Sequence, residues 1–161
     1  MDYHDRPFAV AWYTNGQPVK DERLFMEVVR SNPDIEFIAV GATDSLLNAD
    51  NLTAAGWQSN LARLWPNVRV VLNTSAFEGE PNFILQGLAG GCLAVGRDNA
   101  GLLALAQSYP NHVSTAKPEE LPSLVQDVVS GRYPISAPDV PSSTTTVTEW
   151  LSLIRELVAD D

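Results

Sequence analysis

SAFEGEPNFILQGLAGG, residues 75–91, is the stretch that decides the fold of this 161-residue chain. The apolar run VRVVLN, residues 68–73, precedes it and has the length and composition of a buried strand. The second half of the stretch has apolar residues at helical spacing, and we expect Asn82 to cap this helix. Two glycines at its end predict the helix terminus. The stretch thus predicts a strand, a loop with Glu78 and Gly79, and a helix.

The same alternation of apolar runs and helical periodicity extends over most of the chain. Further strands are expected at residues 8–13, 35–40, 92–96 and 112–115, with a weaker one within 44–56. Further helices are expected at residues 20–30, 61–65, 102–106 and 118–129. Continuously apolar strands that alternate with helices predict an α/β fold, a Rossmann-like parallel sheet of about five or six strands with helices on both faces.

A parallel sheet of this kind binds ligands at the carboxyl ends of its strands. The loop after residue 73 leads to a helix start, where unpaired N–H groups and the helix dipole attract phosphate. Glu78 would not hold phosphate there, but its carboxylate can accept hydrogen bonds from the hydroxyls of a sugar. Gln86, further along the same helix, would reach a ribose diol. Residues 78–86 are therefore the candidate ligand site.

The composition excludes several kinds of partner. The net charge is −10 and Lys and Arg form no cluster, so we expect neither nucleic acid nor an anionic membrane surface to bind the chain. The two histidines have no ligating neighbours, so no metal site is expected. The single cysteine, Cys92, lies in the apolar run GGCLAV and is expected to be a buried, unreactive thiol. Because the N-terminal residues lack a secretory signal pattern, we expect a cytoplasmic protein.

EGEPNFILQGLAGG, residues 78–91, resembles the donor-binding motif of retaining GT-B glycosyltransferases of family four, roughly E-G-x-P-N-x-x-L-E-A-M-A-x-G. A less specific likeness covers most of residues 7–131. The resemblance implies the half of a hexose transferase that binds the nucleotide sugar, a UDP-, GDP- or ADP-sugar, with no metal ion or other cofactor. It also implies that the chain is not active alone, because a separate or deleted N-terminal acceptor domain would have to complete the cleft.

The resemblance implies one set of substrate-binding residues, which are Glu78, Gly79, Pro81, Asn82, Phe83, Gln86, Asn15 and Lys20. Glu78 would bind hydroxyls of the transferred sugar, and Gln86 would bind the ribose of the nucleotide. The backbone N–H groups around residues 81–83 would approach the donor. The loop after the first strand, with Asn15 and Lys20, would contact the diphosphate. No catalytic residue is assigned in this half.

Two positions depart from the family's pattern. Gln86 stands where the family has its second glutamate, and an amide is expected to weaken nucleotide binding by about 1–3 kcal/mol. The family's arginine after the first strand is missing, and Asn15 lies in that segment. Lys20 matches the family's lysine, or it is an ordinary surface lysine at a helix start. Trp57 either shelters a nucleobase or, as we expect, fills the sheet edge as a partly buried side chain.

The chain divides into three segments. Residues 1–132 are expected to form the nucleotide-sugar-binding domain, and the Pro-, Ser- and Thr-rich residues 133–146 an extended linker. Residues 147–161 are expected to form a helix that packs on this domain or on a missing N-terminal one. Three explanations stay open, namely an excised domain, a subunit with its acceptor domain on another chain, and a degenerate binding or scaffold module. A flavodoxin-like or receiver module has the same element order, but the scattered aspartates do not form a receiver's cluster.

Overall fold

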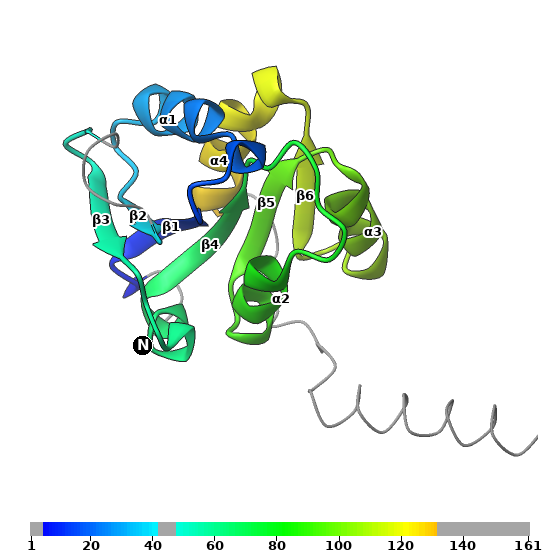
Figure 1. Cartoon of the computed structure of the whole chain (residues 1–161), viewed down its shortest axis with the longest axis horizontal. Helices are drawn as coiled ribbons and strands as arrows, with labels where there is room; N and C mark the ends of the chain where they lie inside the picture. The colour runs from blue at the N-terminus through cyan, green and yellow to red at the C-terminus, as the bar shows by residue number, and fades with distance from the viewer. Residues whose placement is uncertain (1–4, 42–47, 132–161) are drawn as a thin grey trace, which may run out of the picture.

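The computed structural model describes residues 5–41 and 48–131. These residues form a six-stranded parallel sheet in the order β3-β2-β1-β4-β5-β6, with helices on both faces (Figure 1). The predicted α/β, Rossmann-like fold is therefore confirmed. The predicted linker, residues 133–146, and the predicted C-terminal helix, residues 147–161, lie outside the described residues. Within the described ranges, no helix has the length and apolar content that crossing a bilayer requires.

The strands are β1 (Phe8–Tyr13), β2 (Phe37–Val40), β3 (Leu52–Gly56), β4 (Val68–Asn73), β5 (Leu93–Arg97) and β6 (Val113–Ala116). The α-helices are α1 (Glu22–Ser31), α2 (Asn82–Ala89), α3 (Ala100–Ser108) and α4 (Leu121–Val129). Short 3-10 turns are η2 (Pro18–Lys20), η3 (Leu61–Arg63), η4 (Trp65–Asn67) and η5 (Pro118–Glu120).

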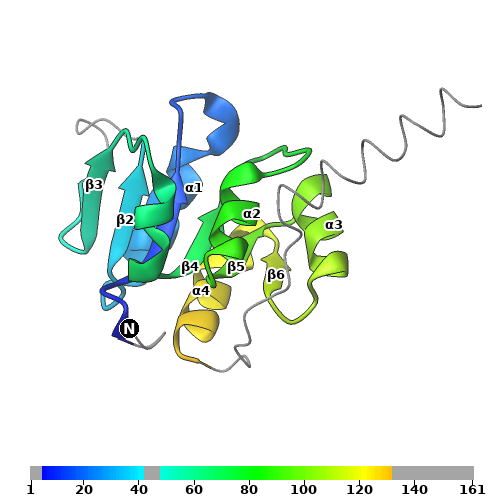
Figure 2. The ribbon, with the colours of Figure 1, turned by 90° about the horizontal axis from the view of Figure 1, so that it is seen from below.

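The strand register brings the ends of the strands to one edge of the sheet. Tyr13 at the end of β1 pairs with Val40 at the end of β2, and Asn73 at the end of β4 pairs with Gly96 of β5. Figure 2 shows the sheet from β3 at one edge to β6 at the other. The chain runs outward from β1 to β3, then returns to β4 and continues to β6. Strands up to β3 therefore extend the sheet toward one edge, and strands from β4 onward extend it toward the opposite edge.

Two helices cover each face of the sheet. Alternate residues of a strand point to opposite faces, and the apolar residues on each face pack against the helices there. Val10 and Trp12 of β1 lie in a buried core with residues of α1 and α4. Ala11 between them lies in a second core with residues of α2 and α3. In the first core the rings of Trp12 and Phe25 stack with centroids 4.0 Å apart, an arrangement that contributes about 0.5–1.5 kcal/mol beyond area burial.

Arg6 forms hydrogen bonds with backbone carbonyls near the amino ends of β4 and β5. Its Nη1 donates to the backbone carbonyls of Val68 at 2.7 Å, Gly91 at 3.1 Å and Trp65 at 3.3 Å. Cys92 lies beside it and is buried, as predicted. Burial raises the pKa of the Cys92 thiol to about 12, so the thiol stays neutral at physiological pH.

Several details of the predicted helices are wrong, each for a local reason. Asn82 does not cap α2, because Ile84 and Leu85 already donate their N–H groups to the carbonyl of Pro81, which occupies the cap position. The helix expected at 20–30 begins only after Asp21, whose left-handed backbone (φ 50°) separates η2 from α1. The helix expected at 61–65 is two 3-10 turns, η3 and η4, with i→i+3 bonds.

Candidate functional site

A cavity of about 360 Å³ lies at the carboxyl ends of β1 and β4. Its walls come from the end of β1, the turn η2, the loop between β4 and α2, and the first turns of α2. Trp57 and Gln58, just after β3, complete the far wall. This is the point at which the strand order reverses, where open α/β sheets bind their ligands.

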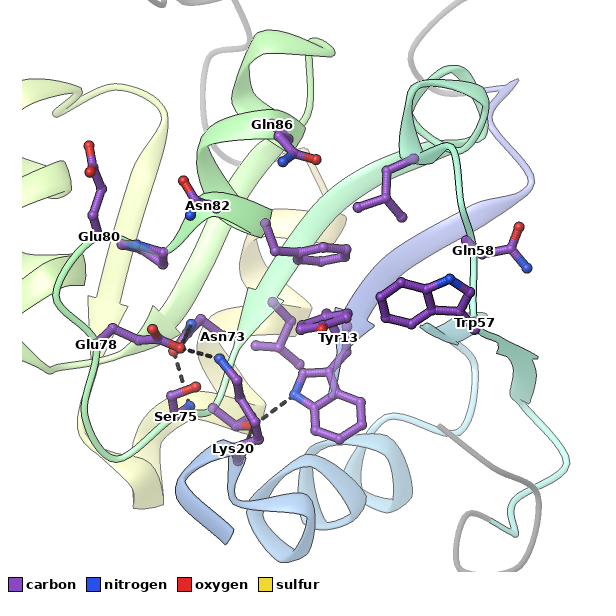
Figure 3. A pocket seen from close by; sticks show the side chains of 16 residues that line it. Tyr13, Lys20, Trp57, Gln58, Asn73, Ser75, Glu78, Glu80, Asn82 and Gln86 are labelled. Carbon is purple, nitrogen blue, oxygen red and sulfur yellow. Dashed lines mark hydrogen bonds and ion pairs between the residues drawn. The ribbon is translucent and has the colours of Figure 1, made fainter. Parts of the chain in front are cut away.

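Glu78 and Lys20 form an ion pair inside this cavity. Lys20 Nζ lies 2.6 Å from Glu78 Oε1, and both side chains are about five-sixths buried, with exposures of 16% and 15%. Asn73 Nδ2 also donates to Glu78 Oε1 at 3.4 Å. The Ser75 hydroxyl donates to the same carboxylate, and Figure 3 shows Lys20, Asn73 and Ser75 converging on it. Glu78 is therefore held as a carboxylate by three donors from two segments of the chain.

These contacts set the charge of Glu78. Burial raises the pKa of this carboxyl, but the hydrogen bonds from Lys20, Ser75 and Asn73 and the positive charge of Lys20 together outweigh burial. The pKa of Glu78 consequently lies below its ordinary value of 4.5, and the group is ionised at neutral pH. An ionised carboxylate accepts hydrogen bonds and donates none, so hydroxyl groups are suitable partners for its remaining lone pairs.

The N-terminus of α2 is the second polar feature of the cavity. Pro81, Asn82 and Phe83 line the cavity, and no side chain caps this helix. The first N–H groups of any α-helix, here those of Asn82 and Phe83, have no partner within the helix. Among the other α-helices, α1 and α3 are capped by the side chains of Asp21 and Asn99, and α4, which follows the turn η5 outside the cavity, has no side-chain cap either. The cavity thus contains an uncapped helix start of the kind that binds anions.

Aromatic side chains form much of the apolar wall of the cavity. The ring of Phe83 stacks on Tyr13 with centroids 5.5 Å apart and meets Trp65 edge-on at 5.1 Å. Lys20 Nζ lies 5.8 Å from the centroid of the Tyr13 ring. Trp57 lies across the cavity from the Lys20 and Glu78 pair (Figure 3). A second, more open cavity of about 740 Å³ adjoins the first and shares Trp57 with it.

The prediction for the burial of Trp57 is wrong. Its side chain is 75% exposed, although we expected it to fill the sheet edge partly buried. The reason is its position, because β3 ends at Gly56, whose left-handed backbone (φ 61°) turns the chain away before Trp57. The indole therefore lies at the mouth of the two cavities and not against the sheet.

Six of the eight predicted substrate-binding residues line the cavity, and these are Lys20, Glu78, Pro81, Asn82, Phe83 and Gln86. Asn15 and Gly79 are not part of its lining. The exposed side chain of Asn15 instead accepts a hydrogen bond from the N–H of Gln17 at 3.3 Å. The carbonyl of Gly79 lies close to Gly101, where an added Cβ would meet it at 2.5 Å. The ligand-binding roles of all eight residues stay predictions.

Sequence reasoning missed several residues of the cavity. Tyr13, Asn73 and Ser75 come at or directly after the ends of β1 and β4, so the rule that ligands bind at carboxyl ends could have named them. Gln58 follows β3, which the sequence predicts only weakly. Glu80 also lines the cavity edge, but Figure 3 shows its side chain pointing away from the cluster around Glu78.

The fold and the cavity together define a Rossmann-like domain with a polar cavity at the point where the strand order reverses. The sequence matches no known family profile and no curated protein sequence. The structure is similar to that of Anabaena HepE in complex with UDP, with a TM-score of 0.68 and 15% identity, covering 98% of this chain and 49% of HepE. It is also similar to TarM, with a TM-score of 0.67 and 14% identity, covering 78% of this chain and 29% of TarM.

A further similar structure is WaaG, a glycosyltransferase involved in lipopolysaccharide biosynthesis. Its TM-score is 0.62 and its identity 12%, covering 78% of this chain and 39% of WaaG. The chain therefore has the Rossmann-like fold found in GT-B glycosyltransferases. It spans less than half the length of each of these three structures.

Proposed function

We propose that the cavity binds a nucleotide sugar and that the chain is the donor-binding half of a glycosyltransferase. The observation that carries the proposal is the Lys20–Glu78 ion pair beside the uncapped start of α2. A diphosphate needs a cation and free N–H donors, and a sugar ring needs a fixed acceptor for its hydroxyls. The cavity has all three within one loop, one turn and one helix start. Similar structures that hold UDP or UDP-glucose support the proposal.

In this proposal each part of the donor has its own wall of the cavity. The diphosphate lies between Lys20 and the first N–H groups of α2, and the sugar hydroxyls contact Glu78. The ribose lies near Gln86, which is exposed one turn into α2. The nucleobase stacks on Trp57, since a largely exposed indole at the mouth of two adjoining cavities can cover one face of a flat ring.

The reaction itself requires a second half. The similar structures are all more than twice as long as the part that this chain covers. We infer that transfer of a hexose, with retention of anomeric configuration as in family four, takes place in a cleft that an acceptor domain completes. Residues 1–132 would then form the donor domain, and this chain alone would bind the donor without turning it over.

The test is a calorimetric titration of the full chain with UDP-, GDP- and ADP-sugars, repeated with Gln86→Glu. We expect one base to be preferred, with micromolar to submillimolar affinity. A carboxylate at position 86 should strengthen binding by about 1–3 kcal/mol, or about 5- to 150-fold, because it binds a diol through two charge-assisted bonds. Gln126→Glu, an exposed position on α4 outside the cavity, is the matched control for the added charge.

A second candidate function is a degenerate, non-catalytic GT-B-like module used for binding or as a scaffold. Gln86 in place of the family's second glutamate favours it, as does Asn15 in the segment where the family has an arginine. Lys20 is then the cation that remains for a diphosphate among the residues that line the cavity. Failure of every nucleotide sugar to bind at millimolar concentration, to the wild type and to Gln86→Glu alike, would establish this candidate over the first.

A further inference from the structure

A buried chain of hydrogen bonds runs from the core of the sheet to Lys20. The indole N–H of Trp12 donates to Thr74 Oγ1 at 2.8 Å. The Thr74 hydroxyl in turn donates to the backbone carbonyl of Lys20 at 2.6 Å. Trp12 is 1% exposed and Thr74 is fully buried, so loss of the Thr74 hydroxyl without a replacement would leave the Trp12 N–H buried and unpaired. Thr74 thus connects the first strand with the turn that carries Lys20.

This connection matters because the turn has little stability of its own. Lys20 ends η2, a single 3-10 turn of three residues, and such short turns depend on contacts with the rest of the fold. The loop after β4 provides these contacts through Thr74 and through the Ala76 N–H, which donates to the Val19 carbonyl at 2.8 Å. The same loop carries Glu78, the partner of the Lys20 ammonium group.

We propose that Thr74 is a positioning residue, which fixes the backbone of Lys20 so that its ammonium group stays between Glu78 and the bound diphosphate. That a diphosphate binds beside Lys20 rests on the proposed function. A lysine side chain has four rotatable bonds, so its ammonium is well placed only if its backbone is fixed and its end is paired. Thr74 fixes the backbone and Glu78 pairs the end, and both belong to one loop.

The role proposed for Thr74 depends on its hydroxyl group. One hydroxyl group accepts from the Trp12 N–H and donates to the Lys20 carbonyl at the same time. Serine retains both functions. Valine has the shape of threonine but can neither accept nor donate, so Thr74→Val removes the connection while filling the same space.

The first test compares the binding of UDP and uridine to the full chain and its variants. Thr74→Val should weaken UDP about tenfold, which corresponds to about 1.4 kcal/mol, and leave uridine unchanged, because only UDP contacts Lys20. Thr74→Ser should restore most of the affinity for UDP. Val125→Ala, in the core under α4 and away from the cavity, is the control for general loss of stability. Equal losses for UDP and uridine in Thr74→Val would overturn the proposal.

The second test needs no ligand and separates this inference from the proposed function. Lys20 is the charged group that contacts Glu78 in the described part of the chain, and Asn73 and Ser75 provide neutral donors. Carbon-13 NMR titration of the Glu78 carboxyl should show a higher pKa in Thr74→Val than in the wild type and in Thr74→Ser. If the wild type binds no nucleotide, the proposed function fails, and this titration still decides the role of Thr74.

An unchanged Glu78 titration in Thr74→Val would overturn the positioning role, whatever the outcome with UDP. If Thr74→Val does not fold, Thr74→Ala provides the same comparison, because the smaller side chain leaves space for a water molecule to satisfy Trp12. The alanine variant should also raise the pKa of Glu78, since a water molecule fixes the Lys20 carbonyl less firmly than a covalently held hydroxyl.

Discussion

Arg6 at the amino ends of the central strands and Lys20 at their carboxyl ends contact different kinds of acceptor. At the amino ends, Arg6 donates to three backbone carbonyls, those of Trp65, Val68 and Gly91. Backbone carbonyls are fixed parts of the fold, so none of these acceptors can leave. We infer that Arg6 contributes to the stability of the fold at this end of the sheet.

At the carboxyl ends, Lys20 contacts a side chain in a cavity. Its partner Glu78 lies on a loop, and the pair lines a space of about 360 Å³. A side-chain carboxylate in a cavity can exchange part of its contact with lysine for contacts with a ligand, whereas a carbonyl between strands cannot. Lys20 therefore combines a side-chain acceptor with a place in the cavity wall, whereas Arg6 has three backbone acceptors.

The largest expected effect comes from breaking the amino end. Arg6→Ala should lower the free energy of unfolding by about 2–4 kcal/mol, because three acceptor carbonyls lose a charged donor. Chemical denaturation of the full chain measures this loss, with Arg23→Ala, an exposed position on α1, as the control. The folded variant should bind UDP as the wild type does. A loss below about 1 kcal/mol would show that Arg6 behaves as a surface residue.

An intermediate effect, on binding and not on stability, is expected at the carboxyl end. Lys20→Met should weaken UDP by about 10- to 100-fold, because a charge-assisted contact with the diphosphate is lost. Its unfolding free energy should change by about 1 kcal/mol or less, because the pair lines an open cavity and Asn73 and Ser75 still donate to Glu78. The only other lysine, Lys117, is exposed before η5 and provides a matched control, Lys117→Met. Equal UDP affinities of the two variants would contradict the role of Lys20.

The fold could be predicted from the sequence because it depends on local patterns. Apolar runs such as residues 68–73 have one stable environment, a strand buried on both faces, and they become β4 and its neighbours. The loop with Glu78 could be located because it lies between a strand and a helix, both of which the sequence predicts. The carboxyl ends of the strands then define the place of the cavity, but not its contacts.

The contacts could not be predicted because they join distant segments. Lys20 and Glu78 are 58 residues apart, and their meeting depends on how η2 folds over the loop after β4. Thr74 has no pattern in the sequence that would indicate its bonds to Trp12 and to the Lys20 carbonyl. The orientation of Trp57 likewise depends on the backbone of Gly56, which a sequence does not specify.

The smallest expected effect is a pH dependence of stability that arises from Glu78 alone. Its pKa in the folded protein lies below the ordinary 4.5 that applies to the unfolded chain. The unfolded state therefore binds the proton more tightly, and the stabilisation is complete above pH 4.5 and lost as the pH falls through the lower, folded pKa. Because the effect of burial on the pKa of Glu78 offsets much of the effect of Lys20, Ser75 and Asn73, the net contribution should be less than about 1 kcal/mol.

Urea denaturation at a series of pH values between neutrality and the acid limit measures this contribution as the difference between the wild type and Glu78→Gln. The difference should shrink below pH 4.5, and Glu80→Gln, on the exposed side of the same loop, should follow the wild type. When Lys20→Met is added to both proteins, most of the pH dependence of this difference should disappear, since the substitution removes the charge that lowers the pKa of Glu78. A difference that stays constant through this range would show that the pKa of Glu78 is the same in the folded and unfolded states, so that ionisation of Glu78, unlike the contacts of Arg6, contributes nothing to stability.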